Sequence, residues 1–443
     1  MSFVFWERCG VNVASLSRVG LLKRFGFTLF ALVVYRLGTY IPIPGINLSV
    51  IEEIVSGHTA GVLGIFNVFS GGALGRMTIF ALNVMPYIVA SIMVQLLTAA
   101  IPALNEMRQE GEIGRNKINS YTRYLAVVFC VIQGLMVLLG LERMNTPDVT
   151  VVMDPGMTFR IVGVSSMLAG TMFLLWLGER INLRGIGNGI SLIIFVGIIS
   201  ELPSSISSIF LLGKRGEITG FAVFAMLLAF LALFLLIIFF ERSYRRVLVQ
   251  YPKRQVGSRF YNSDSSYMPL KINISGVIPP IFANALMLSL MTLAKFNSGA
   301  PWADFIVQYF SADSMLYIAM YIALIVFFTF FYTSLVFDAK ETSEMLKKNG
   351  GFIPGKRPGN STREYFEAVI KRLTVIGSLY LAVVCVVPEI MRHYYAISFT
   401  LGGTSFLIIV NVINDTFSQV QTQIYSGRYS SLMKKSELWK KVK

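Results

Sequence analysis

The residue types that usually perform catalysis or bind metals are few and scattered in this chain of 443 residues. It contains two histidines and three cysteines, at positions His58, His393, Cys9, Cys130 and Cys385. Neither set has the spacing that a zinc site or a His-based catalytic group requires. Ser191 lies in a glycine-rich stretch without a histidine in reach, and neither HExxH nor GxxxxGK[ST] occurs. We therefore expect a protein that is not an enzyme, with no metal and no cofactor.

The composition instead predicts a helical membrane protein. Hydrophobic residues make up 54% of the chain and charged residues 14%, whereas soluble domains carry about 25% charged residues. Segments with few or no charges recur along the sequence, and each approaches the roughly 20 residues that cross a bilayer as a helix. They cover residues 25–42, 77–105, 124–141, 161–178, 185–208, 218–240, 272–294, 314–337, 373–388 and 393–414.

The distribution of basic residues indicates an orientation for these ten spans. With both termini placed in the cytoplasm, 31 of the 39 Lys and Arg fall on the cytoplasmic side and seven on the other. Such an excess is the positive-inside signal, and it accounts for most of the net charge of +15 without a nucleic-acid partner. Arg36, the remaining one, lies inside the first span, where a charge is either functional or reaches the interface.

Three connecting segments differ from the short loops elsewhere. Residues 241–271 and 338–372 are long, basic cytoplasmic loops that also contain aromatic and turn-forming residues. Residues 61–75 are apolar, too short to cross a bilayer and interrupted by glycines. This third segment is either a re-entrant piece buried in protein or an amphipathic helix on the external surface.

Motifs along the chain resemble those of one family. In order, they are RLGTYIPIPGI (36–46), NVFSGGALGR (67–76), MPYIVAS (85–91), RGIGNGIS (184–191), GVIP (276–279), PGKRPG (354–359) and GGTS (402–405). Together they resemble the bacterial SecY family, the central subunit of the Sec protein translocase. The resemblance implies an all-α fold of two inverted five-helix halves, residues 1–212 and 213–425, around a central pore, followed by a basic cytoplasmic tail at 426–443.

The same resemblance implies an apolar constriction in the pore. A ring of aliphatic side chains on the second, fifth, seventh and tenth spans would hold back water and ions, because a narrow apolar neck dewets. Aliphatic residues in spans usually face lipid or core, so only the motif context selects these positions. The ring residues are Val84, Ile88, Ile194, Ile281 and Ile408.

Two further elements follow from the resemblance. Residues 62–75 correspond to the plug, a segment that closes the idle pore, and its members are Gly64, Phe66, Asn67, Phe69, Ser70, Gly71 and Gly72. A lateral gate between spans 2–3 and 7–8 would release hydrophobic segments into lipid. Its polar candidates are Ser91, Gln133 and Asn273, with Val89 where the family often has a small polar residue. Ordinary hydrogen bonds between helices are the alternative role for Gln133 and Asn273.

The long basic loops resemble a docking surface for the ribosome, including its RNA, or for the SecA motor. Lys356 and Arg357 are the first candidates and Lys253, Arg254 and Arg259 the second. These charges could alternatively serve only to set topology. The Pro and Gly residues around Arg357 favour docking, because topology alone does not require a fixed loop tip.

The sequence thus predicts a channel for unfolded polypeptides in a bacterial plasma membrane, with SecE-like and SecG-like small subunits as partners. Three other classes of membrane protein are alternatives to a channel. A solute transporter would need charged residues near the middle of its spans, which here are aliphatic. An intramembrane enzyme lacks its catalytic set, as described above. An insertase or scaffold without a pore differs from a channel only in conduction.

Overall fold

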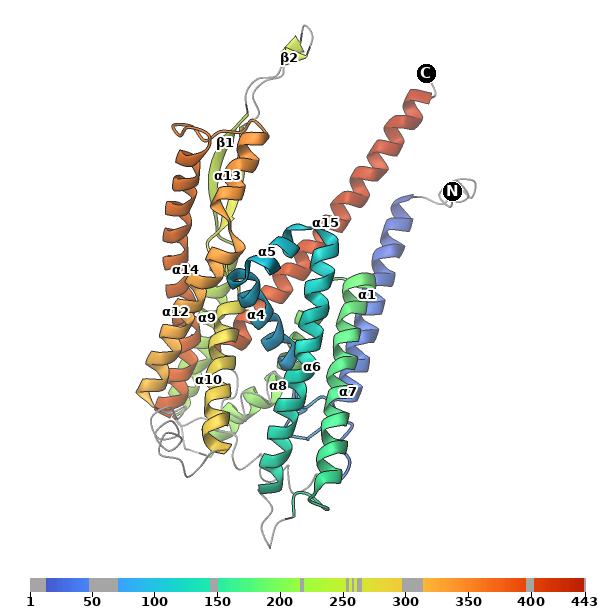
Figure 1. Ribbon diagram of the computed structural model, residues 1–443, viewed down its shortest axis with the longest axis vertical. Helices are drawn as coiled ribbons and strands as arrows, with labels where there is room; N and C mark the ends of the chain where they lie inside the picture. Colours follow the sequence, from blue (N-terminus) through green and yellow to red (C-terminus); the bar gives the residue numbers. More distant parts are fainter. Residues whose placement is uncertain are drawn as a thin grey trace. The chain divides into compact units, whose positions relative to one another are not determined.

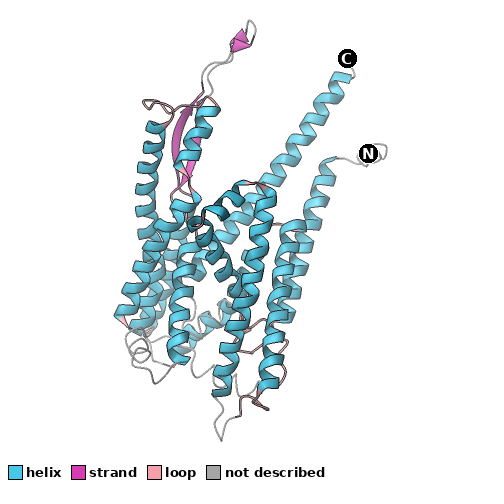
Figure 2. Cartoon of the chain, in the orientation of Figure 1, coloured by secondary structure: helices cyan, strands magenta, loops and turns pink. Residues whose placement is uncertain are grey.

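The computed structural model describes residues 13–47, 71–143, 150–215, 219–251, 255–256, 259–260, 265–296, 314–395 and 402–441. Helices dominate these residues, and the strands are confined to one hairpin (Figures 1 and 2). Within the described residues, six helices are long and apolar enough to cross a membrane, or seven if the bent pair α4 and α5 forms one span. The prediction of an all-α membrane protein is therefore confirmed.

Each of the ten predicted spans overlaps a helix among the described residues. These helices are α1 (Val13–Gly38), α4 (Met85–Ala100), α6 (Glu112–Arg143), α7 (Met157–Arg184), α8 (Gly189–Lys214), α9 (Gly220–Glu241), α10 (Ile278–Phe296), α12 (Met315–Val336), α14 (Asn360–Tyr395) and α15 (Gly403–Lys441). Two shorter helices, α5 (Pro102–Gln109) and α13 (Ala339–Lys348), lie in connections. The second predicted span begins later than residue 77, because Met77 and Asn83 have positive φ angles that interrupt a helix.

The chain divides into two compact units, which we describe separately. The first unit comprises Met1–Ser205 and Ile408–Lys443. In it α4 packs on α6, α6 on α7, and α7 on α1. Its buried apolar cluster joins residues from the turns before α4 to residues of α6 and α7, including Ile43, Leu74, Met77, Leu138 and Met167. The predicted halves 1–212 and 213–425 stay a prediction.

The second unit, Ile206–Leu407, combines helices with a β-hairpin. Helices α10 and α14 both pack on α12, and α9 contacts α14. Strand β1 (Tyr244–Gln250) pairs antiparallel with β4 (Ser265–Lys271), so that Tyr244 lies opposite Lys271. Short strands β2 (Gln255–Val256) and β3 (Arg259–Phe260) pair farther along the hairpin. The described part of the first long loop thus forms a hairpin.

The two long loops pack together into one small folded body. We call it the loop module: the described parts of residues 243–271 and 337–373. Gln250 and Phe352 exchange two backbone hydrogen bonds of 2.9 Å, which join the hairpin to the second loop. An apolar cluster around the fully buried Phe366 includes Val247, Leu270 and Ile353. Contact between the two loops was not predicted, because nothing in the spacing of either loop refers to the other.

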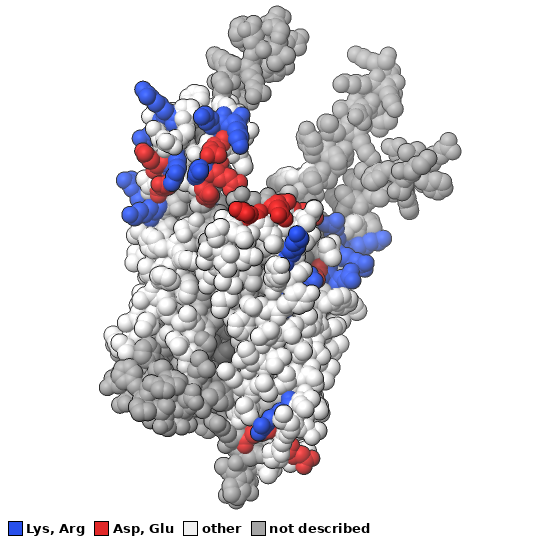
Figure 3. Space-filling model, viewed as in Figure 1, with Lys and Arg blue, Asp and Glu red and all other residues white. Residues whose placement is uncertain are grey.

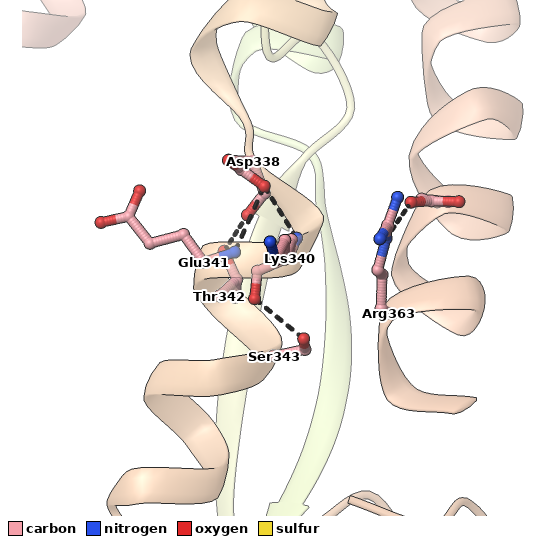
Figure 4. A network of polar contacts seen from close by, with 7 residues as sticks. Asp338, Lys340, Glu341, Thr342, Ser343 and Arg363 are labelled. Atoms are coloured by element: carbon pink, nitrogen blue, oxygen red, sulfur yellow. Dashed lines mark hydrogen bonds and ion pairs between the residues drawn. The ribbon is translucent and has the colours of Figure 1, made fainter. Parts of the chain in front are cut away.

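Helix α13 of the loop module begins with a side-chain cap. The Asp338 carboxylate accepts hydrogen bonds from the backbone N–H groups of Lys340 (2.8 Å) and Glu341 (3.2 Å). It satisfies donors that have no partner inside the helix. Figure 4 shows this cap in front of the hairpin, with Arg363 on the neighbouring α14. The cap fixes where α13 begins.

Charged side chains gather near the ends of the helices in both units (Figure 3). The surface over the middle of the helices is uncharged in this view, as expected for a region in contact with lipid. In the second unit, Lys and Arg mixed with Asp and Glu cover the loop module. The structure thus presents the loop module as a polar body attached to an apolar bundle.

Candidate functional site

Two of the predicted ring residues lie one helical turn apart at the start of α4. Val84 is the residue immediately before this helix and is fully buried. The backbone N–H of Ile88 donates to the Val84 carbonyl over 3.1 Å, so the two side chains project from the same side of the helix. Ile88 is half-buried. The non-helical turns that precede Val84 therefore determine where this pair lies.

The other predicted ring residues come from three more helices. Ile194 lies on α8 and Ile408 on α15, and both are buried. Ile281 lies near the start of α10 and is half-buried. Ile281 belongs to the second unit and the other four residues to the first. The ring as a whole stays a prediction.

Most of the predicted plug lies outside the described residues, namely Gly64, Phe66, Asn67, Phe69 and Ser70. Gly71 and Gly72 are described, and both are buried. They open a run of turns, residues 71–84, that we call the turn segment. It is joined to the stretch after α1 by hydrogen bonds from the Ile43 N–H to the Met77 carbonyl and from the Ile79 N–H to the Ile41 carbonyl.

The turn segment is also held by the charge inside the first predicted span. The guanidinium of Arg36, on α1, donates to the Gly71 carbonyl over 2.8 Å. The guanidinium groups of Arg36 and Arg76 lie 5.3 Å and 4.6 Å from the centre of the Tyr40 ring, within the range of cation–π attraction. Arg36 therefore has a structural partner within its own unit, at the end of the segment predicted to be the plug.

Both glycines at this position allow close approach to α8. The φ angles of Gly71 and Gly72 are +65° and +82°, a region that disfavours other residues. A Cβ atom on Gly71 would lie 2.8 Å from the Gly197 Cα, and one on Gly72 would lie 2.5 Å from a carboxylate oxygen of Glu201. Glycine at these two positions lets the chain take this path without strain, and at Gly71 it also lets the backbone of α8 come close.

The three predicted gate residues have different surroundings. Ser91 on α4 accepts a 3.2 Å hydrogen bond from the amide of Gln95, one turn later on the same helix. Gln133 lies half-buried on α6. Asn273 is buried, and its amide donates to the carboxylate of Glu241 over 2.8 Å. Asn273 thus has a hydrogen bond within the second unit, of the kind weighed as its alternative role, and its part in a gate stays a prediction.

The predicted docking residues Lys356 and Arg357 occupy an exposed loop tip in the loop module. The Arg357 carbonyl accepts a 2.9 Å hydrogen bond from the Thr362 hydroxyl near the start of α14, which fixes the backbone of the tip. Gly355 and Gly359, on either side, have φ angles of +79° and +106°. Lys253 and Arg254 lie outside the described residues, and for Arg259 only its place in β3 is described.

Sequence reasoning missed two contributions to these sites. Glu241, which ends α9, was counted only as the boundary of a charge-free segment, although it is 3% exposed. A carboxylate at the C-terminal end of a helix opposes the helix dipole, and this is a signal that could have singled it out. The bond of Arg36 to a carbonyl 35 residues away had no sequence signal, because any backbone carbonyl can accept it.

Comparison with known proteins agrees with the motifs. The family model described as SecY matches residues 78–417. The protein translocase subunit SecY of Rickettsia bellii is 49% identical over 428 residues, which cover 96% of this chain and 99% of that protein. Among solved structures, one described as a protein-conducting channel superimposes with a TM-score of 0.62 at 18% identity, covering 92% of this chain and 93% of the other. Sec61 in a canine ribosome–channel complex from the endoplasmic reticulum gives 0.59 at 17% identity with the same coverage. At these identities the two structures show the fold alone.

Proposed function

Because the chain belongs to the SecY family of protein translocase subunits, we propose that it forms the channel through which a Sec translocase moves unfolded polypeptides across a bacterial plasma membrane. The observation that carries this proposal is the 49% identity with a translocase subunit over 96% of the chain. The ten helices at the predicted spans and the channel fold support it.

The proposed seal is apolar. Val84 at the start of α4, Ile88, Ile194, Ile281 and Ile408 are its members, carried by α4, α8, α10 and α15. In this proposal they form a constriction from which water and ions are excluded. A peptide can pass such a neck regardless of sequence, because aliphatic side chains make no specific hydrogen bonds with it. Residues 62–75 close the neck when no peptide is present.

Sideways release uses the same apolar driving force as folding. A hydrophobic segment that reaches the gate near Ser91, Gln133 and Asn273 moves into lipid, since burial of apolar area contributes about 25 cal/mol per Å². Polar groups at the gate oppose this exit until a sufficiently hydrophobic segment competes with them.

The proposed partners dock on the loop module. Lys356 and Arg357 would contact the SecA motor or ribosomal RNA, and their affinity would fall as salt rises. Small SecE-like and SecG-like subunits complete the complex, and both termini face the cytoplasm. The chain itself is not an enzyme in this proposal, so the energy for transport comes from the motor, from the ribosome or from the proton gradient.

The test is translocation by purified protein. The chain is reconstituted into liposomes with the small subunits, and an unfolded precursor and the motor ATPase are added outside. We expect ATP-dependent protection of the precursor from protease, and none in liposomes that contain only the small subunits. Equal protection in both preparations would contradict the proposal.

The plug assignment has its own test in the same liposomes. Deletion of residues 64–73 should increase ion leak in the absence of precursor, because the apolar neck alone closes less completely. Deletion of ten residues from the external segment 297–306 serves as the control and should leave the leak unchanged. An unchanged leak in the first variant would remove the assignment.

A further inference from the structure

The loop module joins α10 through a short connecting segment, residues 272–277. The segment follows β4 directly and leads into the first turn of α10. The backbone N–H of Ile272 donates to the Ser243 carbonyl over 3.2 Å, next to the end of α9. Gly276 has a φ angle of +64°, so the chain changes direction there just before the helix starts. The start of α10 is therefore placed by whatever holds these six residues.

Asn273 holds the segment at both ends of its turn. Its side-chain amide donates one hydrogen bond to Glu241 Oε1 (2.8 Å) and another to the Gly276 carbonyl (3.1 Å). Its side-chain oxygen accepts a bond from the Ser275 hydroxyl (3.1 Å). Both amide donors of this buried side chain thus have partners, one on α9 and one in the turn that begins α10.

Glu241 occupies a position that is unfavourable for a carboxylate. It is the last residue of α9, where the helix dipole is negative, and only 3% of it is exposed. A buried charge is tolerated only where hydrogen bonds replace water. The Asn273 amide supplies one such bond, which connects the end of α9 to the segment that leads into α10.

We propose that Glu241 is a positioning residue that sets the resting orientation of α10 through Asn273 and thereby keeps the channel selective for authentic signal segments. The inference rests on the proposed function, in which α10 bears Ile281 and one side of the gate. When the bond to Glu241 is lost, the connecting segment no longer has this side-chain link to α9, and α10 moves away from its closed position more easily.

One pair of substitutions isolates the bond. Asn273→Asp keeps the shape of the side chain, removes both donors and places a second carboxylate beside Glu241. The double variant Glu241→Gln with Asn273→Asp reverses the roles, since the new amide at 241 can donate to the new carboxylate at 273. Asn349→Asp makes the same chemical change at an exposed residue that follows α13 and serves as the matched control.

Transport of two precursors distinguishes positioning from a merely structural role. For Asn273→Asp we expect export of a precursor with a weakened signal segment to rise about tenfold, because the loss of one buried hydrogen bond shifts the population of the closed channel by about that factor. Export of the intact precursor, per inserted channel, should rise less than that of the weakened precursor, because its strong signal segment already opens most channels. In the double variant, export of the precursor with the weakened signal segment should return toward the level of the original chain. A parallel fall in the export of both precursors would overturn the inference. An equal rise in export of the weakened precursor in Asn349→Asp would also overturn it.

Hydrogen exchange without any substrate separates this inference from the proposed function. In Asn273→Asp the amides of residues 282–287 in α10 should exchange faster, while those of α12 should not change. Unchanged exchange in α10 overturns the inference whatever transport shows. Faster exchange in α10 in a chain that exports no precursor at all would count against the proposed function and not against the positioning role of Glu241.

Discussion

The turn segment, residues 71–84, and the loop tip, residues 353–359, are two connections that use the same residue types in different surroundings. Each contains glycines with positive φ angles. A Cβ atom on Gly71 would meet the backbone of α8, whereas a Cβ atom on Gly355 or Gly359 would have no atom within 4 Å. The first connection needs glycine for space and for conformation, and the second needs it for conformation alone.

The basic residues of the two connections also differ in their surroundings. Arg36 donates to the Gly71 carbonyl and, with Arg76, stacks on Tyr40, so these charges hold the turn segment. Lys356 and Arg357 lie exposed on a backbone that is fixed by the start of α14. The comparison indicates that the turn segment is built for internal packing and that the loop tip presents its charges to solvent. Four substitutions test this contrast, from the largest expected effect on stability to the smallest.

Phe366→Ala should have the largest effect, because it removes the fully buried ring at the centre of the loop module. Replacing a core Phe by Ala costs about 3–5 kcal/mol. The free energy of unfolding in detergent, measured by chemical denaturation, should fall by that amount. A loss below about 1 kcal/mol would mean that the two loops do not share a core.

Gly71→Ala should follow, with a loss of about 2–4 kcal/mol. The substitution combines a left-handed backbone that alanine disfavours with a methyl group 2.8 Å from the Gly197 Cα. The same denaturation measurement applies. A loss no larger than that of Gly355→Ala would show that α8 does not approach the turn segment this closely.

Gly355→Ala is the matched control for that variant, since it has a similar φ angle and open space around the missing Cβ. Only the conformational cost remains, about 1 kcal/mol. Denaturation should show this smaller loss. A loss above about 3 kcal/mol would mean that the loop tip is packed against something and is not an open turn.

Arg357→Glu should change the free energy of unfolding by less than about 0.5 kcal/mol, because exposed charges contribute little to stability. It should nevertheless abolish most motor-driven or ribosome-driven export, with Lys348→Glu, an exposed residue of α13, as the control. Normal export by Arg357→Glu, or an equal defect in both variants, would remove the docking assignment.

Much of the fold could be predicted because lipid imposes a simple rule on the sequence. Charge-free segments of sufficient length form helices, so each predicted span overlaps a helix, six or seven of them long and apolar enough to cross a membrane among the described residues. Helix α4 starts late, where Met77 and Asn83 interrupt the helix. The loop module could not be predicted, since strands β1 and β4 lie in a basic loop and bury only part of one face. Contacts such as Arg36 with Gly71 depend on a backbone carbonyl, which no residue type marks.

The predicted site residues also divide into those located by local sequence features and those whose partners depend on the tertiary fold. Arg357 was placed correctly on an exposed tip because Pro and Gly determine turns locally. Asn273 was selected for its polarity alone, and its partner Glu241 was missed because the two residues lie 32 positions apart. Local chemistry can be read from a sequence, whereas the partner of a buried polar group is set by the tertiary fold.

The central claim is that a polypeptide passes the aliphatic constriction, and crosslinking to an arrested precursor tests it most directly. A photoactivatable amino acid is placed at Ile281 or Ile408, and at Phe221 or Leu228 as controls, which are exposed on the apolar α9. The account predicts crosslinks from both ring positions to the precursor, and crosslinks from the two α9 positions to lipid only. Equal crosslinking from all four positions, or none from Ile281 and Ile408, would contradict it.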